Sequence, residues 1–269
     1  MGLALLFVVW LITLASSYFF VAKTWWMPAG ASAYAAPIDA QIHVTYIAMG
    51  VVFLAAQLAL GLFCWKYRDR ERARVEYSHG NLRMEVTWTV LTAILFIGLN
   101  LMGSRVWAEQ RFQGPKPGAM QVEITGLQFA WYFRYPGPDG KFARTRPELI
   151  DPSAGPEAAV GVDTDDPAGK DDVVTSTLVL PVNREIDATL HAEDVIHDFF
   201  VPELRFKQDA VPGLNIHVHF TPTRIGEYEV ACAELCGLGH YKMRAKLRVV
   251  SEEDFSKWQA ERLAEKQAQ

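Results

Sequence analysis

A short run near the C-terminal end of the chain combines thiol, imidazole and thioether side chains at close spacing. Cys232 and Cys236 are followed by His240 and Met243 in the pattern C-x3-C-x3-H-x2-M, and His197 lies upstream in VIHDFFVPE. These groups are soft or borderline ligands, which favour copper over hard cations. The sequence therefore predicts a metal site built from these five residues.

Three simpler interpretations use only part of this set. A disulfide leaves the histidine and methionine spacing unexplained, and a structural zinc site with four N/S ligands leaves the methionine idle. A mononuclear blue-copper site needs a single cysteine, so this chain has one cysteine too many for it. Two thiolates that bridge two coppers use the whole set, with one histidine and one weak axial ligand for each metal. Such a site has no open position for a substrate, which favours an electron relay.

The proposed ligands lie in a region of short alternating segments separated by Gly, Pro, Asn and Asp, which is typical of a compact antiparallel sandwich or barrel. The expected strands are 121–135 (one long or two short), 176–181, 184–192, 195–201, 214–221, 226–234 and 245–250. Residues 136–175 lack periodicity and indicate an exposed insertion. A capping signal at Ser251 predicts a C-terminal helix over 251–269. His217 and His219 alternate on one strand and are interpreted as surface or interface residues.

The two parts of the chain differ in charge and hydropathy. The 269 residues carry a net charge of −5, which divides into +3 for residues 1–107 and −8 for residues 108–269. In the first part, segments 3–22, 44–64 and 86–103 are apolar all round and long enough to cross a bilayer as helices. We therefore expect a membrane-anchored protein with an acidic polar domain.

The loop between the second and third apolar segments predicts their orientation. Residues 66–83 are rich in Lys and Arg, whereas residues 24–43 contain neither. An excess of these residues marks cytoplasmic loops, so we expect a hairpin over 42–107 with loop 66–83 in the cytoplasm and the acidic domain on the periplasmic face. Residues 1–22 are expected to form an N-terminal transmembrane helix or signal anchor. A signal peptide cleaved at an Ala-x-Ala tripeptide between residues 31 and 35 is the alternative.

The composition excludes several classes of protein. A hydrophobic fraction of 50% excludes a disordered polymer, and three cysteines are too few for a disulfide-rich secreted scaffold. No basic face compensates the acidic balance, so nucleic acid is not an expected partner.

Four blocks of this sequence resemble subunit II of a haem–copper cytochrome c oxidase. They are HGNLRMEVTWT (79–89), GLQFAWYFRYPG (126–137), EDVIHDFFVPELRFKQDAVPG (193–213) and CAELCGLGHYKM (232–243). The resemblance covers residues 42–250. It implies a membrane α-helical hairpin, here preceded by an extra N-terminal helix, and an all-β cupredoxin Greek-key barrel over 108–250 with the insertion 136–175. In the family this barrel holds a binuclear copper centre, CuA.

The resemblance also implies a role for each proposed ligand. Cys232 and Cys236 would bridge the two coppers. His197 and Met243 resemble the ligands of one copper, and His240 and the carbonyl of Glu234 resemble those of the other. The Glu234 side chain matches a family residue that reaches a magnesium ion shared with subunit I.

Further residues match or depart from the family pattern. Glu85 matches a carboxylate that, in the family, lies at the cytoplasmic mouth of a proton channel in subunit I. The family block G-x-Q-W-x-W has Phe129 in place of its first tryptophan, so we expect electron entry past Phe129 or Trp131. Carboxylates near the copper motif are expected to attract a donor with a basic face. They are Glu193, Asp194, Asp198 and Asp209.

The implied function is electron entry into a terminal cytochrome c oxidase of the inner (cytoplasmic) membrane. CuA would pass electrons from a periplasmic cytochrome c or cupredoxin to haem in subunit I, where O2 is reduced and protons are pumped. Expected partners are subunit I with its haems and CuB, subunit III and the donor. A CuA-containing nitric-oxide reductase is the alternative. The complete ligand set disfavours a quinol oxidase or a copper-delivery protein.

Overall fold

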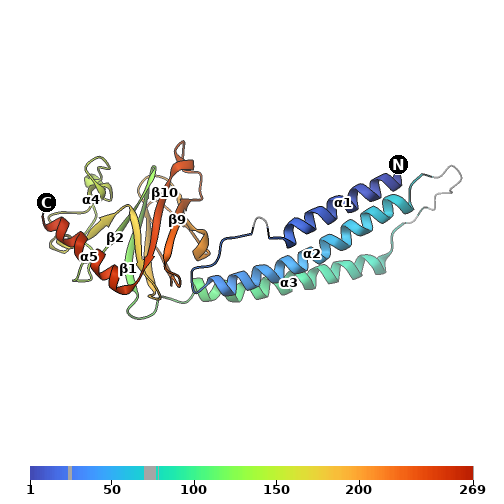
Figure 1. Cartoon of the computed structure of the whole chain (residues 1–269), viewed down its shortest axis with the longest axis horizontal. Helices are drawn as coiled ribbons and strands as arrows, with labels where there is room; N and C mark the ends of the chain where they lie inside the picture. Colours follow the sequence, from blue (N-terminus) through green and yellow to red (C-terminus); the bar gives the residue numbers. More distant parts are fainter. Residues whose placement is uncertain (24–25, 70–76, 78, 269) are drawn as a thin grey trace. The chain divides into compact units, whose positions relative to one another are not determined.

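The computed structural model of the chain divides into an α-helical unit and a β-rich unit (Figure 1). The residues that the structure describes are 1–23, 26–69, 77 and 79–268. The helical unit comprises Met1–Met27 and Pro37–Trp107, and the β-rich unit comprises Pro28–Ala36 and Ala108–Gln269.

Three long helices form the first unit: α1 (Gly2–Val21), α2 (Ala35–Lys66) and α3 (Leu82–Arg111). Among the described residues, these three are long and apolar enough to cross a membrane. Their apolar side chains are mostly exposed in the chain alone, as expected of helices that are surrounded by lipid or by partner helices. The basic loop expected between α2 and α3 includes residues 70–76 and 78, which lie outside the described residues.

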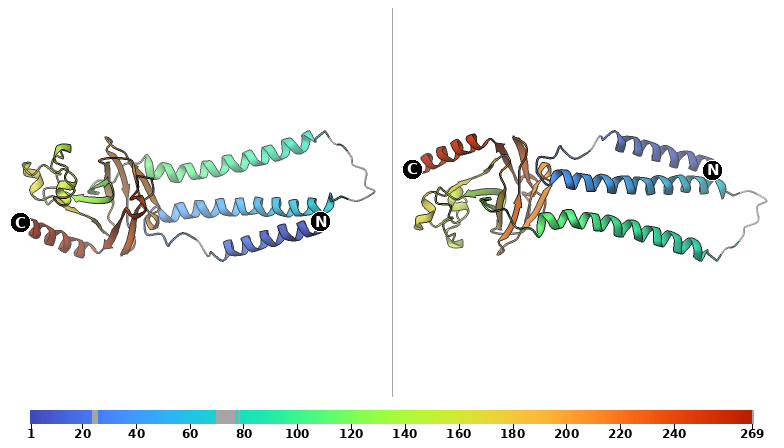
Figure 2. Two further views of the ribbon diagram at one scale, coloured as in Figure 1. Left: turned by 90° about the horizontal axis from the view of Figure 1, so that it is seen from above. Right: turned by 90° about the horizontal axis from the view of Figure 1, so that it is seen from below.

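Helix α1 runs alongside α2 (Figures 1 and 2). The indole of Trp10 occupies the space beside Gly61, where any side chain would collide with it. Nearer the other end of α1, Phe20 and Tyr46 meet edge to face with ring centroids 5.4 Å apart. The first apolar segment is therefore a helix with specific contacts to its neighbour.

The segment after α1 is built into the β-rich unit. Ala31 is fully buried, and its N–H donates to the carbonyl of Glu203 at 2.7 Å. The hydroxyl of Ser32 donates to the carbonyl of Leu204 at 2.6 Å. The Ala-x-Ala tripeptides considered as cleavage sites lie in this segment, Pro28–Ala36.

The β-rich unit consists of two five-stranded sheets with strand orders β3-β2-β1-β5-β8 and β4-β10-β9-β6-β7. The strands are β1 (Met120–Leu127), β2 (Ala130–Tyr135), β3 (Val173–Thr175), β4 (Thr177–Pro181), β5 (Ile186–Ala192), β6 (His197–Val201), β7 (Phe206–Ala210), β8 (Ile216–Phe220), β9 (Gly226–Cys232) and β10 (Arg244–Val250). Pairs β1–β5 and β4–β10 are parallel. The other pairs are antiparallel, in keeping with the expected antiparallel sandwich or barrel. The two parallel pairs are formed by strands distant in sequence, which alternation alone does not reveal.

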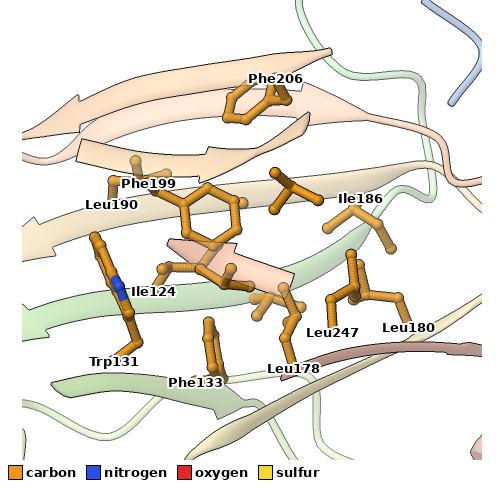
Figure 3. Close-up of a cluster of buried hydrophobic side chains, with 14 of the residues drawn as sticks. Ile124, Trp131, Phe133, Leu178, Leu180, Ile186, Leu190, Phe199, Phe206 and Leu247 are labelled. Carbon is orange, nitrogen blue, oxygen red and sulfur yellow. The ribbon is translucent and has the colours of Figure 1, made fainter. Parts of the chain in front are cut away.

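The core lies between the two sheets, and Figure 3 shows its large side chains. Alternate residues of β1 and β5 point into it, among them Ile124, Ile186 and Leu190, and Leu178 and Leu247 meet them from the other sheet. Burying one such side chain contributes about 1.5–3 kcal/mol to folding. This core gives the loops at the end of the sheets a rigid base.

The segment 136–175 is less exposed than its composition indicates. It contains the short helix α4 (Pro156–Ala159) and its own apolar cluster with Val160 and Val162. The buried guanidinium of Arg134 binds the fully buried Asp172 carboxylate through Nε at 2.9 Å and also donates to the carbonyl of Ala143. A tertiary ion pair thus fastens the insertion to β2.

The C-terminal helix α5 (Glu252–Gln267) begins at a side-chain cap, because the Ser251 hydroxyl accepts from the N–H of Asp254 at 3.1 Å. Trp258 packs edge to face on Tyr135 of β2, with centroids 5.0 Å apart. Near the other end of α5, the Lys266 ammonium donates to the carbonyls of Gly169 and Asp172 at 2.8 Å. α5 therefore secures both the sheet and the insertion.

Candidate metal centre

Three β strands bring the predicted ligands together at one end of the sheets. His197 begins β6, Cys232 ends β9, and Met243 directly precedes β10. The register pairs Phe199 of β6 with Cys232 of β9, and the Cys232 N–H donates to the Met243 carbonyl at 3.1 Å. These contacts close residues 233–242 into a loop above the core.

Inside this loop the donor atoms lie close together. The sulfurs of Cys232 and Cys236 are 3.8 Å apart, and both cysteines are free. The Cys236 sulfur also lies 3.7 Å from His240 Nδ1 and 3.7 Å from the Met243 sulfur. The Cys232 thiol donates to the carbonyl of Glu234 at 3.1 Å. The structure therefore gathers two thiols, an imidazole, a thioether and a carbonyl around one small volume.

His197 completes the set from β6, the strand beside β9 in the same sheet. Its donor atom and the two cysteine sulfurs lie within 4.8 Å of one another, and all three residues are buried. His197 is fully buried and its Nδ1 has no hydrogen-bond partner. A buried imidazole nitrogen without a partner is costly unless it binds something, so this atom fits a metal ligand.

The Cys236 thiol is protonated at neutral pH. Burial and the neighbouring Cys232 raise the pKa of the Cys236 thiol to about 11. Copper binds thiolate, so metal binding must release protons from this site. The donor set of soft sulfur and imidazole nitrogen fits copper.

The hairpin turn between β1 and β2 packs against these ligands. Gly126 allows the His197 ring to lie directly against β1, because any side chain there would collide with the ring. The amide of Gln128 donates to the Cys236 carbonyl at 2.6 Å. The block that carries the family resemblance thus supports the metal loop, and sequence reasoning missed Gly126 and Gln128 because both are unremarkable residue types.

The two expected electron-entry residues occupy different environments. Trp131 is 1% exposed, and its ring meets the His197 ring edge to face at 5.9 Å. Phe129 is half-buried and lies against Gly237 and Gly239 of the metal loop. Trp131 at a donor contact is therefore excluded by its burial, and Phe129 is the member of the pair that reaches the surface.

The four carboxylates expected to dock the donor also differ in their exposure to solvent. Asp209 is exposed and Glu193 is half-buried, with burial and the neighbouring Asp194 raising the pKa of Glu193. Asp198 is 1% exposed and pairs with Lys207 at 3.2 Å, so its placement on a docking surface is wrong. Burial raises the pKa of the Asp198 carboxyl, although Lys207 opposes the shift.

Asp194 lies directly behind a proposed ligand. Its Oδ1 is 2.8 Å from His197 Nε2, and its two oxygens also accept backbone N–H groups of Gln128 and Val195, each at 2.7 Å. Partial burial alone would raise the pKa of Asp194, but the hydrogen bonds from His197 and the two N–H groups outweigh it and lower the pKa. The carboxylate is held in its charged form.

Three other predicted residues lie outside this cluster. The Glu234 side chain is exposed at the surface of the metal loop. Glu85 is exposed in the first turn of α3, where Asn81 caps the helix by accepting from the N–H of Arg83 at 3.1 Å. His219, expected at the surface or in an interface, is buried, and its Nε2 lies 2.6 Å from the Gln113 carbonyl.

The described architecture is that of a membrane-anchored protein with a cupredoxin-like β domain. The model of the cytochrome c oxidase subunit II periplasmic domain matches residues 120–250. The chain is 35% identical over 258 residues to the alternative cytochrome c oxidase subunit 2 of Bradyrhizobium diazoefficiens, covering 95% of this chain and 91% of that protein. It is 31% identical over 265 residues to the cytochrome c oxidase subunit 2 of Thermostichus vulcanus, covering 88% and 79%.

A solved structure is also similar. The crystal structure of the periplasmic domain of subunit II of cytochrome oxidase (CoxB) of Bradyrhizobium japonicum is 29% identical, with a TM-score of 0.41 over 57% of this chain and 99% of that one.

The chain belongs to the cytochrome c oxidase subunit II family. It is a subunit of a haem–copper oxidase, an oxidoreductase complex in which subunit I is its partner. The family's cupredoxin domain implies copper, and the cluster of His197, Cys232 and Cys236 is consistent with a CuA site.

Proposed function

We propose that this chain is the electron-entry subunit of a terminal cytochrome c oxidase and that the gathered ligands hold a binuclear CuA centre. The two cysteine sulfurs, 3.8 Å apart, would bridge the metals. His197 with Met243 would serve one copper, and His240 with the Glu234 carbonyl the other. The observation that carries the proposal is the fully buried His197, which has an unpartnered Nδ1 and is gathered with two free thiols.

Copper held by these residues would supply one-electron transfer between a periplasmic donor and haem in subunit I. The chain's own residues hold the ligands rigid, because β6, β9 and β10 are fixed by the core. A rigid ligand set changes little between oxidation states, which favours fast electron transfer. The relatives named above are cytochrome c oxidase subunits, which supports oxygen over nitric oxide as the terminal acceptor.

The donor would meet the surface near Phe129. This ring packs on the metal loop through Gly237 and Gly239, and it is the more exposed member of the aromatic pair. Glu193, Asp194 and Asp209 would attract a cytochrome c or cupredoxin with a basic face, and such attraction is screened by salt. We expect the oxidation rate of a basic donor to fall as ionic strength rises. A flat profile would contradict the docking role.

The remaining roles concern the complex. The exposed Glu234 carboxylate would reach a magnesium ion shared with subunit I, and Glu85 would lie at the cytoplasmic mouth of its proton channel. Helices α1, α2 and α3 would cross the inner membrane with residues 66–83 in the cytoplasm and the β domain in the periplasm. Subunit III is a further expected partner.

Copper content and electron paramagnetic resonance of the purified complex test the central proposal. We expect two coppers in this chain and a seven-line signal, because one unpaired electron would be shared over two equivalent copper nuclei. A single copper, or zinc, in the site would overturn it. Consumption of nitric oxide in place of oxygen by the same preparation would move the chain to a nitric-oxide reductase.

A further inference from the structure

We infer that Asp194 is a positioning residue of the metal site, in addition to any contribution its charge makes to donor binding. The inference rests on the proposed copper centre. It concerns which nitrogen of His197 is free to bind metal and how the β1–β2 turn is held against the site.

The Asp194 carboxylate determines the tautomer of His197. An ionised carboxylate only accepts hydrogen bonds, so the contact of 2.8 Å requires a proton on His197 Nε2. In the neutral imidazole, Nδ1 then carries the lone pair, and this is the buried ring nitrogen without a hydrogen-bond partner. The ring is gathered with the two thiols. Ligating histidines commonly donate their second N–H to a carboxylate, which fixes the ring and raises its basicity.

The same carboxylate also holds the turn that supports the other side of the site. Asp194 Oδ2 accepts the backbone N–H of Gln128 at 2.7 Å. The side chain of Gln128 in turn donates to the Cys236 carbonyl at 2.6 Å. One acidic side chain therefore connects a proposed imidazole ligand to the loop that carries a proposed thiolate ligand.

Geometry separates Asp194 from the other acidic residues of this region. Both of its side-chain oxygens accept hydrogen bonds from within the domain, and one of them contacts the His197 ring. Glu193, the adjacent carboxylate, is half-buried, and its backbone N–H donates to the Gly126 carbonyl at 3.1 Å. Glu193 therefore provides a control that removes the same charge one residue away.

The test compares D194N and E193Q in the full-length chain loaded with copper, with no donor present. An asparagine keeps the shape but offers one acceptor oxygen in place of two, so either the His197 or the Gln128 contact is lost. We expect D194N to lose copper to a chelator about 10–100-fold more readily than wild type and to show altered copper hyperfine splitting. E193Q should keep the wild-type signal and retention. D194E, which restores a carboxylate, should recover part of the retention.

The outcomes separate the two proposals. If wild type shows the two-copper signal and D194N matches E193Q in signal and retention, the positioning role is overturned while the copper centre stands. If wild type itself holds no two-copper centre, the proposed function fails and this inference with it. Circular dichroism of both metal-free variants identifies a D194N chain that has simply unfolded. D194E then decides: a folded D194E with the wild-type hyperfine splitting and partial or full retention supports the role, whereas a folded D194E that does not retain copper overturns it.

Discussion

The helical unit and the β-rich unit differ in how they bury apolar side chains. Large apolar residues of α3, such as Phe96 and Ile97, are more than half exposed in the chain alone, whereas the core residues Phe133, Ile124 and Leu190 are fully buried. The helices satisfy their backbone hydrogen bonds internally and leave their apolar surface to lipid or partner subunits. The β domain must build its own core, and only that core can hold ligands from distant strands in fixed positions.

This difference predicts where substitutions act. A change in the metal loop should abolish function without affecting the helices, and a change in the β core should reduce stability more than the same change on a helix. The following experiments test that contrast.

The largest effect is expected for Cys236→Ser. Its sulfur lies within 3.8 Å of the Cys232, His240 and Met243 donor atoms, so no other group can replace it. We expect loss of the two-copper signal and a fall of more than about 100-fold in donor oxidation by the complex, since even outer groups around a metal site are worth about 10–100-fold. Cys64→Ser in α2 is the matched control and should retain full copper content. Retention of two coppers by Cys236→Ser would contradict the ligand assignment.

A stability effect is expected for Phe133→Ala. Phe133 is fully buried in β2, and removal of such a ring costs about 3–5 kcal/mol. The paired substitution Phe96→Ala, at a position 69% exposed on α3, should cost less than about 1 kcal/mol. Thermal or denaturant unfolding followed by circular dichroism measures both. Equal losses would show that the helical unit has a core of its own.

A smaller effect is expected for Gly239→Ala. Gly239 has an ordinary backbone φ of −92°, but a Cβ atom there would collide with the Phe129 ring. We expect a destabilisation of about 1–3 kcal/mol and a displaced metal loop. Gly98→Ala in α3, where a Cβ meets open space, is the control. The double variant Gly239→Ala, Phe129→Ala should recover most of the stability, and failure to do so would show that the collision is not the cause.

The smallest effect concerns pH. Burial raises the pKa of Glu123 above its ordinary value of 4.5, although Arg134 opposes the shift. The folded chain therefore holds this proton more tightly than the unfolded chain, so the contribution of Glu123 to stability is fully present below 4.5 and is lost as pH rises through the raised pKa. Glu123→Gln should flatten the dependence of melting temperature on pH in this window. Parallel curves for the two proteins would contradict the assignment.

Much of the protein could be predicted from its sequence because the relevant signals are local. Apolar segments of membrane length predicted α1, α2 and α3, and period-two alternation predicted most strands. The spacing of Cys232, Cys236, His240 and Met243 within one loop also predicted their proximity. Strands β3 and β7 were missed because β3 is three residues long and β7 reads FKQDA, with two charged residues in five.

Features that depend on distant residues could not be predicted. Nothing local indicates that Arg134 and Asp172 form a buried pair or that β1 runs parallel to β5. The same limit applies to the acidic residues of the site. Sequence grouped Asp194 and Asp198 as surface charges, but the fold buries Asp198 against Lys207 and turns Asp194 toward His197.

The sequence by itself determined which part of the chain suits a membrane and which suits water, because hydropathy is a property of individual residues. It also determined the chemistry of the metal loop, because ligand type is likewise a property of individual residues. Only the tertiary structure decided that His197, 35 positions before Cys232, lies with the two thiols. It also decided which histidine nitrogen is left without a partner. Both depend on the pairing of β6 with β9 and on the turn between β1 and β2, and such pairings are set by the shared core.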